Sequence, residues 1–374
     1  MKFSFFHLMP WTDLEAVPTT WPVPTREFDG QRAKELYDAY TDTMAYAESC
    51  GFDWVGCNEH HFSPYGLMSN CNLVGAQLAH RTSKIGLAML GNLVPLLNPV
   101  RVAEEYAMID CMSGGRLIAG FVRGIPHEYI AYNVAPSESR RRMQEAVELI
   151  IKCWTEPEPF GWEGEFYQFP AISLWPRPFQ KPHPPILMSA SNEESAEFVG
   201  HFPAMMGMTL IPSLPVARKA IDLYRQTSLA HGRETGPEHV MTGHHTCIAA
   251  TDEEAKEHMR SALAYFHRVL MRPQLEAQAL VVEGTQFFSN PQLGQGFTKR
   301  LETLRERTLD EQIEAGTILC GSPESVVAQI RRIAAELGNG RINMNMKIGT
   351  MPDDVVRRSM ELFRDRVLPE VKDL

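Results

Sequence analysis

The 374-residue chain lacks the features that would place it in several common classes of protein. It has no apolar stretch long enough to span a bilayer, so no membrane segment is predicted. Basic residues are outnumbered by acidic ones (36 against 46, net charge −10) and form no cluster, which argues against nucleic acid or an anionic membrane as a partner. The seven cysteines are unevenly spaced, without a Cys-x-x-Cys pair. They indicate no disulfide framework and favour a reducing compartment, the cytoplasm.

Motifs for several kinds of site are also missing. The chain has no His-Glu-x-x-His helix, no Gly-x-Gly-x-x-Gly or Walker loop, and no Gly-x-Ser-x-Gly elbow. We therefore expect no metal ion and no Rossmann or ATP-binding fold. The apolar segment 3–9 is short and meets Pro10 at once, without a small-residue cleavage site. It is predicted to be a buried strand rather than a signal peptide.

Strand-like and helical segments alternate along most of the chain. Strands are predicted near residues 2–7, 52–57, 84–90, 117–121, 185–189, 204–209, 240–250 and 342–348. Roughly eight strand–helix pairs are what a TIM (β/α)8 barrel requires, and no repeat or linker divides the chain. We predict a single α/β domain over residues 1–374. Residues 155–182 interrupt the pattern as an irregular insertion or small hairpin, and the polar segment 272–310 is predicted to be a mobile active-site loop.

Three ionisable residues, Glu59, His60 and His61, follow the strand that ends at Cys57. The carboxyl ends of strands in a parallel α/β protein carry its ligands and its chemistry, so this cluster predicts a site. Adjacent residues of an extended segment point in opposite directions, which disfavours a metal held by both histidines. One of them, His61 more readily than His60, can instead be a hydrogen-bonded structural residue.

Two further strand ends carry residues suited to an anion. Arg123 follows the fourth predicted strand, where it could clamp a phosphate or carboxylate or form a surface salt bridge. Ser191, Asn192 and Ser195 stand where the fifth predicted strand leads into a helix. Such residues can bind an anion together with the free N–H groups of the helix, or serve as an ordinary N-cap. Arg123 on the adjacent strand end would turn the cap into a phosphate site.

Together these segments resemble the bacterial-luciferase-like, flavin-dependent monooxygenases. The resemblance extends along nearly the whole chain, in the family's order and spacing, through residues 51–53, 59–62, 95–105, 110, 113–116, 122–124, 184–185 and 321–324. It implies a TIM barrel that binds FMN at the carboxyl ends of its strands. Luciferase α chains carry a cysteine where Val122 stands, so light emission is not expected.

The resemblance also implies roles for individual residues. His60 matches the family's active-site histidine. Leu90, Gly91 and Asn92 match the strand end that lies against the isoalloxazine ring, where the family often has a non-proline cis peptide. The positions near the FMN phosphate match Arg123, Ser191, Asn192 and Ser195, with Ser191 replacing the family's acidic residue. Candidates for substrate contacts or an apolar lid, each apolar one equally compatible with the core, are Met9, Trp11, Glu59, His61, Phe62, Met68 and Trp175.

The implied reaction uses reduced FMN and O2, through a flavin C4a-hydroperoxide, to oxygenate a small organic substrate. A histidine such as His60 would handle the proton. No flavin-reducing domain is visible, so a separate NAD(P)H-dependent flavin reductase would supply reduced FMN. A homodimer or higher homo-oligomer is expected. Alternatives are a deazaflavin-dependent oxidoreductase on the same barrel, disfavoured by the segment 59–61, and a non-catalytic flavin-binding subunit, disfavoured by the presence of both His60 and Arg123. The residues leave hydroxylation, Baeyer–Villiger insertion and oxidative ring opening equally open.

Overall fold

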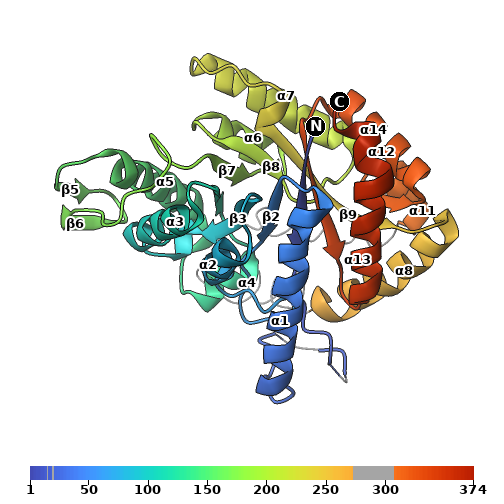
Figure 1. The fold of residues 1–374 in the computed structure, drawn as a ribbon. Helices are drawn as coiled ribbons and strands as arrows, with labels where there is room; N and C mark the ends of the chain where they lie inside the picture. Colours follow the sequence, from blue (N-terminus) through green and yellow to red (C-terminus); the bar gives the residue numbers. More distant parts are fainter. Residues whose placement is uncertain (15, 19–20, 273–306) are drawn as a thin grey trace.

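The computed structural model describes residues 1–14, 16–18, 21–272 and 307–374 of the chain. Eight parallel strands pair in the order β9-β11-β1-β2-β3-β4-β7-β8, and pairing of β8 with β9 closes the ring (Figure 1). A further strand, β10 (Ile318–Gly321), pairs with the second half of β9. The barrel strands are β1 (Lys2–His7), β2 (Trp54–Cys57), β3 (Gly86–Leu93), β4 (Leu117–Val122), β7 (Ile186–Ser189), β8 (Met205–Met208), β9 (Val240–Ile248) and β11 (Arg341–Lys347). The predicted TIM barrel is confirmed.

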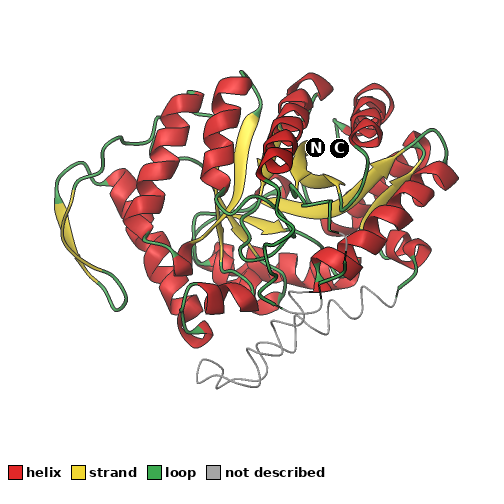
Figure 2. Cartoon of the chain, turned by 90° about the horizontal axis from the view of Figure 1, so that it is seen from below, coloured by secondary structure: helices red, strands yellow, loops and turns green. Residues whose placement is uncertain are grey.

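Helices surround the strands on the outside of the barrel (Figures 1 and 2). The longer ones are α1 (Gly30–Tyr46), α2 (Cys71–Arg81), α3 (Pro99–Ser113), α5 (Ser139–Thr155), α6 (Glu193–Gly200), α7 (Leu214–Ala230), α8 (Asp252–Tyr265), α12 (Pro323–Leu337) and α13 (Asp353–Leu362). Short helices are α4 (Pro126–Ala131), α11 (Leu309–Glu314) and α14 (Leu368–Val371). None of the helices in the described ranges is both long and apolar enough to cross a membrane.

Local sequence explains where the helices begin and end, as α3 illustrates. The Asn98 side chain caps its N-terminus by accepting hydrogen bonds from the N–H groups of Val100 and Arg101 (3.0 and 3.2 Å), and Pro99 occupies its first turn. Gly114 ends it with a left-handed backbone (φ 67°), which glycine adopts without steric cost.

Aromatic side chains attach the strands to the surrounding helices. Trp154 of α5 is completely buried; its indole N–H donates to the carbonyl of Ala103 in α3 (3.0 Å), and its ring stacks on Phe121 of β4. Burying one such side chain contributes on the order of 1.5–3 kcal/mol. The layer between strands and helices therefore holds the strand ends, and the site on them, in fixed positions.

The segment 155–182 leaves the barrel as an antiparallel hairpin of β5 (Phe160–Glu163) and β6 (Gln168–Ile172), which projects beside α5 (Figure 1). Glu145 of α5 fixes its turn by accepting hydrogen bonds from the Trp162 indole (3.1 Å) and the Phe166 N–H (2.8 Å). Of the segment 272–310, residues 273–306 lie outside the described residues, and its last two residues belong to α11.

In the described part of the chain, the sequence pattern did not predict β10, α4 and α11. The helix α4 follows directly on the loop that carries Arg123, in a stretch for which no helix was predicted. This short helix supplies two residues of the site described next.

Candidate active site

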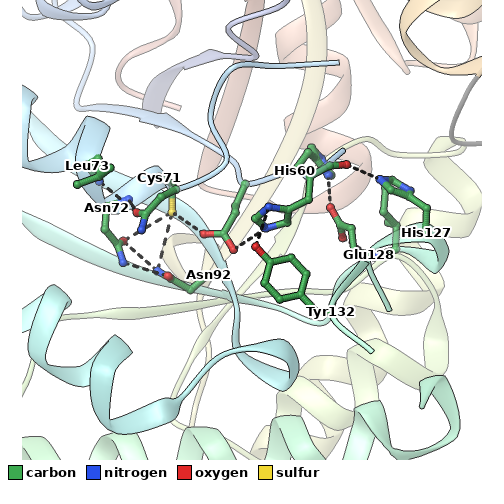
Figure 3. A network of polar contacts seen from close by, with 12 residues as sticks. His60, Cys71, Asn72, Leu73, Asn92, His127, Glu128 and Tyr132 are labelled. Atoms are coloured by element: carbon green, nitrogen blue, oxygen red, sulfur yellow. Dashed lines mark hydrogen bonds and ion pairs between the residues drawn. The ribbon is translucent and has the colours of Figure 1, made fainter. Parts of the chain in front are cut away.

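His60 lies just beyond the carboxyl end of β2 and pairs with a carboxylate from α4. Its Nδ1 is 2.7 Å from Glu128 Oε1, and its side chain remains 16% exposed (Figure 3). Tyr65 packs edge-on against the imidazole, with ring centroids 4.7 Å apart. Among the described residues no hydrogen-bond partner is found for Nε2 of His60. The ring is thus held in one orientation, with Nε2 available to a ligand.

Glu128 is a buried carboxyl group held in its charged form. Burial alone would raise its pKa, but His60 and His127 beside it, and the N–H of Ile125 donating to Oε2 (2.8 Å), hold the pKa below its ordinary value. Burial lowers the pKa of His127 to about 4, so this histidine is neutral near pH 7, and its Nε2–H donates to the carbonyl of His61 (3.2 Å). The Glu128 carboxylate therefore orients the His60 ring through a charge-assisted hydrogen bond from Nδ1.

His61 points to a different carboxyl group from His60. Its Nε2 is 3.3 Å from Glu59 Oε1, and its Nδ1 is 3.1 Å from the Tyr132 hydroxyl (Figure 3). Both Glu59 and His61 are buried, and burial raises the pKa of Glu59. The two histidines do not converge on a point, and the described residues contain no group of three or more side chains placed to hold a metal ion.

The end of β3 carries the non-proline cis peptide that the resemblance implied. The bond between Leu90 and Gly91 is cis, and the register with β4 shifts between Met89 and Asn92. A Cβ on Gly91 would lie 2.2 Å from the carbonyl oxygen of Gly120 on β4. This strand end therefore requires glycine because two backbones approach each other.

The side chain of Asn92 belongs to a buried polar network (Figure 3). It exchanges two hydrogen bonds with Asn72 of α2 (3.0 and 2.9 Å), and Asn72 Nδ2 also donates to Glu105 Oε2 (2.7 Å). Asn92 thus anchors the strand end through its side chain. Of the three residues predicted to contact the flavin ring, Asn92 therefore uses its side chain for buried hydrogen bonds.

Arg123 follows β4 directly, and its guanidinium has no hydrogen-bond or ion-pair partner among the residues that the structure describes. A second arginine, Arg140 in the first turn of α5, lies close by. Burial lowers the pKa of Arg140, and the positive charge of Arg123 lowers it further. Arg140 Nη2 pairs with Glu194 Oε1 (3.1 Å) at the start of α6, and its guanidinium lies over the ring of Phe198 (4.6 Å). Two guanidinium groups therefore stand together beside a helix N-terminus.

Sequence reasoning missed Arg140, although a signal was present. Residues 140–142 are three consecutive arginines, and they occupy the first turn of α5, where the helix dipole favours acidic side chains. Positively charged side chains in the first turn of a helix are repelled by the helix dipole, so another interaction must offset this repulsion. An anion bound between α5 and α6 would supply one.

Ser191, Asn192 and Ser195 form the N-cap of α6. Asn192 Oδ1 accepts from the N–H of Ser195 (2.9 Å), and Ser195 Oγ accepts from the N–H groups of Ser191 (2.9 Å) and Asn192 (3.1 Å). The cap residues are exposed or half-buried, and the first-turn N–H groups of Glu193 and Glu194 lack intrahelical partners. Arg140 thus lies between the two predicted features: it pairs with Glu194 at the start of α6, and it is close enough to Arg123 for the charge of Arg123 to lower its pKa.

Most of the proposed apolar lid belongs to the core. Met9 and Met68 are completely or almost completely buried, and Trp11 is 4% exposed. Phe62 differs, because it is 55% exposed and follows the histidines in a left-handed backbone conformation (φ 55°). Phe62 therefore has a large exposed surface, unlike Met9, Trp11 and Met68.

The prediction that Trp175 lies at the mouth of the barrel is wrong. Trp175 is 84% exposed, but two residues later Arg177 donates to the carbonyls of Trp154 and Thr155, at the C-terminal end of α5. Helices of a (β/α)8 barrel end at the amino edge of the next strand. Trp175 therefore lies at the end of the barrel opposite to His60.

A closed barrel with a histidine–carboxylate pair and two neighbouring arginines at its carboxyl edge has the arrangement of a TIM-barrel enzyme. The sequence model of the luciferase-like monooxygenases matches residues 19–339. The chain belongs to this family.

Individual relatives agree with this assignment. The alkanal monooxygenase alpha chain of Photobacterium leiognathi is 24% identical over 361 residues, covering 92% of this chain and 96% of the relative. The oxygenase component of the flavin-dependent trigonelline monooxygenase of Acinetobacter baylyi is 31% identical over 176 residues, 46% of this chain and 48% of the relative. The crystal structure of monooxygenase RslO1 from Streptomyces bottropensis superposes with a TM-score of 0.77 at 27% identity, covering 99% of both chains. The predicted family and enzyme class, a flavin-dependent monooxygenase, are confirmed.

Proposed function

We propose that this chain is the oxygenase component of a two-component system that uses reduced FMN and O2 to oxygenate a small organic substrate. The observation that carries the proposal is the pairing of His60 with the buried Glu128 carboxylate on the same barrel edge as the Arg123–Arg140 pair. One feature suits proton transfer, and the other suits a phosphate.

The residues present fit FMN. Arg123, Arg140 and the N–H groups at the start of α6 would hold its single phosphate, and the Leu90–Gly91 strand end would lie against its ring. When bound, a reduced flavin supplies the electrons that activate oxygen. His60 would accept or donate the proton at Nε2, while Glu128 orients the imidazole through Nδ1.

Separate delivery of reduced FMN and assembly into a homo-oligomer are part of the proposal. The trigonelline relative is named an oxygenase component, which supports a separate NAD(P)H-dependent flavin reductase. Leu73 on α2 and Met108 and Met112 on α3 are exposed on neighbouring helices, which supports contact with a second copy of the chain. All seven cysteines have free thiols, compatible with a reducing cytoplasm.

Anaerobic equilibrium binding tests the cofactor. The purified chain is titrated with reduced FMN, oxidised FMN, reduced FAD and a reduced deazaflavin, with flavin fluorescence or ultrafiltration as readout. We expect reduced FMN to bind most tightly, because the site offers one phosphate-sized anion pocket. Strong preference for the deazaflavin would favour the oxidoreductase alternative instead. Substrates are then sought with a generic flavin reductase and mass spectrometry for added oxygen.

A further inference from the structure

The two adjacent histidines of the site each contact their own buried carboxyl group, and the pKa values of these two carboxyl groups are shifted in opposite directions. Glu128, against His60, is held as a carboxylate, whereas burial raises the pKa of Glu59, against His61. The negative charge of Glu128 pushes Glu59 further in the same direction. When neighbouring carboxyl groups are driven apart in this way, one is suited to act as an acid and the other as a base.

Glu59 is connected to the surface by a continuous chain of polar contacts. From Glu59 Oε1 to His61 Nε2 is 3.3 Å, and from His61 Nδ1 to the Tyr132 hydroxyl is 3.1 Å. Glu59 and His61 are 3% and 5% exposed, whereas Tyr132 is 38% exposed at the end of α4. The chain therefore has one buried end and one end that a ligand can reach.

The surroundings of Glu59 differ from those of Glu128 in a way that explains the opposite directions of their pKa shifts. Glu128 accepts from a backbone N–H and from His60 at 2.7 Å, whereas the second oxygen of Glu59 faces the Cys71 thiol at 3.9 Å, a weak donor. The backbone of Leu93 and His61 favour the charged form of Glu59, but its burial outweighs them. The titratable groups that act on or respond to Glu59 are Cys57, His61, Cys71, Tyr106, Glu128 and Tyr132.

We propose that Glu59, His61 and Tyr132 form a proton relay that delivers one proton from the buried Glu59 carboxyl group to a ligand at the Tyr132 hydroxyl. The relay is a second proton path beside the His60–Glu128 pair, and its use in catalysis rests on the proposed oxygenase function. Tyr132 is the group that would touch the ligand, while His61 and Glu59 act through it.

The relay balances without an oxidant or reductant. In the loaded state Glu59 Oε1–H donates to His61 Nε2, and His61 Nδ1–H donates to the Tyr132 oxygen. The Tyr132 O–H bond breaks as a bond from its hydrogen to the ligand forms. The His61 Nδ1 proton then passes to Tyr132, and the Glu59 proton passes to His61 Nε2. Glu59 is left as a carboxylate and is recharged from solvent through Tyr132 by the reverse steps.

Infrared spectroscopy of the free protein tests the buried acid without any cofactor. A pH titration should show the C=O stretch of a protonated carboxylic acid near neutral pH, and Glu59→Gln should remove it while Glu128→Gln leaves it. Tyr132→Phe and His61→Gln should shift the band or its titration midpoint, because they break the chain. Tyr46→Phe is the matched control, since the Tyr46 hydroxyl lies 3.2 Å from Glu361 far from the site. A spectrum in which Glu59→Gln removes no protonated carboxyl band overturns the proposal.

Oxygen consumption with photoreduced FMN tests proton delivery during turnover. Over a pH series in H2O and D2O, Glu59→Gln and Tyr132→Phe should each slow the wild-type rate on the order of 10²-fold and lose its solvent isotope effect, whereas Tyr46→Phe should retain both. Tyr132→Phe is included because the residue is partly exposed and the variant should fold. If Glu59→Gln loses the infrared band but keeps the wild-type rate and pH profile, the relay is refuted and Glu59 is a structural acid. If the wild-type chain does not bind FMN, the oxygenase proposal is contradicted instead. The infrared titration, which needs no cofactor, still shows whether Glu59 is protonated near neutral pH.

Discussion

Replacing Arg123 by alanine gives the sharpest test of the cofactor site. Arg123 has no partner among the described residues and lies near the positively charged Arg140, so its guanidinium is not needed for any hydrogen bond in the described part of the fold. A charge-assisted hydrogen bond to a phosphate contributes about 1.5–3 kcal/mol, which corresponds to a roughly 10- to 150-fold weaker Kd for reduced FMN. Thermal stability should be unchanged or slightly higher, because the repulsion with Arg140 is removed.

The assay compares two ligands that differ only in the phosphate. Anaerobic titrations with reduced FMN and reduced riboflavin are made for the wild type, Arg123→Ala and a control, Arg218→Ala. The control removes a positive charge from an exposed pair with Asp222 on α7. Only FMN binding to Arg123→Ala should weaken, and the loss should shrink at high salt as screening increases. An equal loss for FMN and riboflavin, or no loss for either, would refute the assignment of Arg123 to the phosphate.

Three further predictions concern the barrel edge. His60→Ala should retain FMN binding but lower product formation by about 10²–10⁴-fold, with more H2O2 released, as measured by mass spectrometry and a peroxide assay; wild-type product formation would make His60 structural. Glu128 has a lowered pKa, so its contribution to stability is present above its unfolded-state pKa and is lost as the pH falls through the folded value. Urea unfolding of Glu128→Gln should therefore depend less on pH between about pH 5 and 3 than that of the wild type. Gly91→Ala should cost about 1–3 kcal/mol in the same assay, because its Cβ would lie 2.2 Å from Gly120 O; a neutral effect would mean that the strand end is pliable.

The sequence could predict the barrel because the pattern of a (β/α)8 fold is local. Short apolar runs such as 117–121 are long enough to be recognised as buried strands, and caps such as Asn98 and Gly114 mark helix ends. The elements missing from the prediction are short. The helices α4 and α11 have six residues each and β10 has four, so none of the three contains enough periods of its pattern to be detected. The position of Trp175 was predicted wrongly because the composition of its segment does not show at which end of the barrel the segment lies.

The residues of the site that lie at strand ends were predictable, whereas their partners were not. His60 and Arg123 follow apolar strands directly, so the fold alone assigns them to the carboxyl edge. Glu128 is 68 residues away from His60 in the chain and sits on a helix without a clear sequence pattern. Its charge state depends on burial and on the positions of His60, His127 and the Ile125 N–H, which only the folded chain brings together. The same holds for Glu59, which is adjacent to His60 in sequence yet is linked through His61 to the partly exposed Tyr132, 71 residues further along the chain than His61. Glu59, in the motif after β2, and Glu128, on α4, thus acquire pKa shifts in opposite directions from tertiary packing, and this difference is the basis of the proposed proton relay.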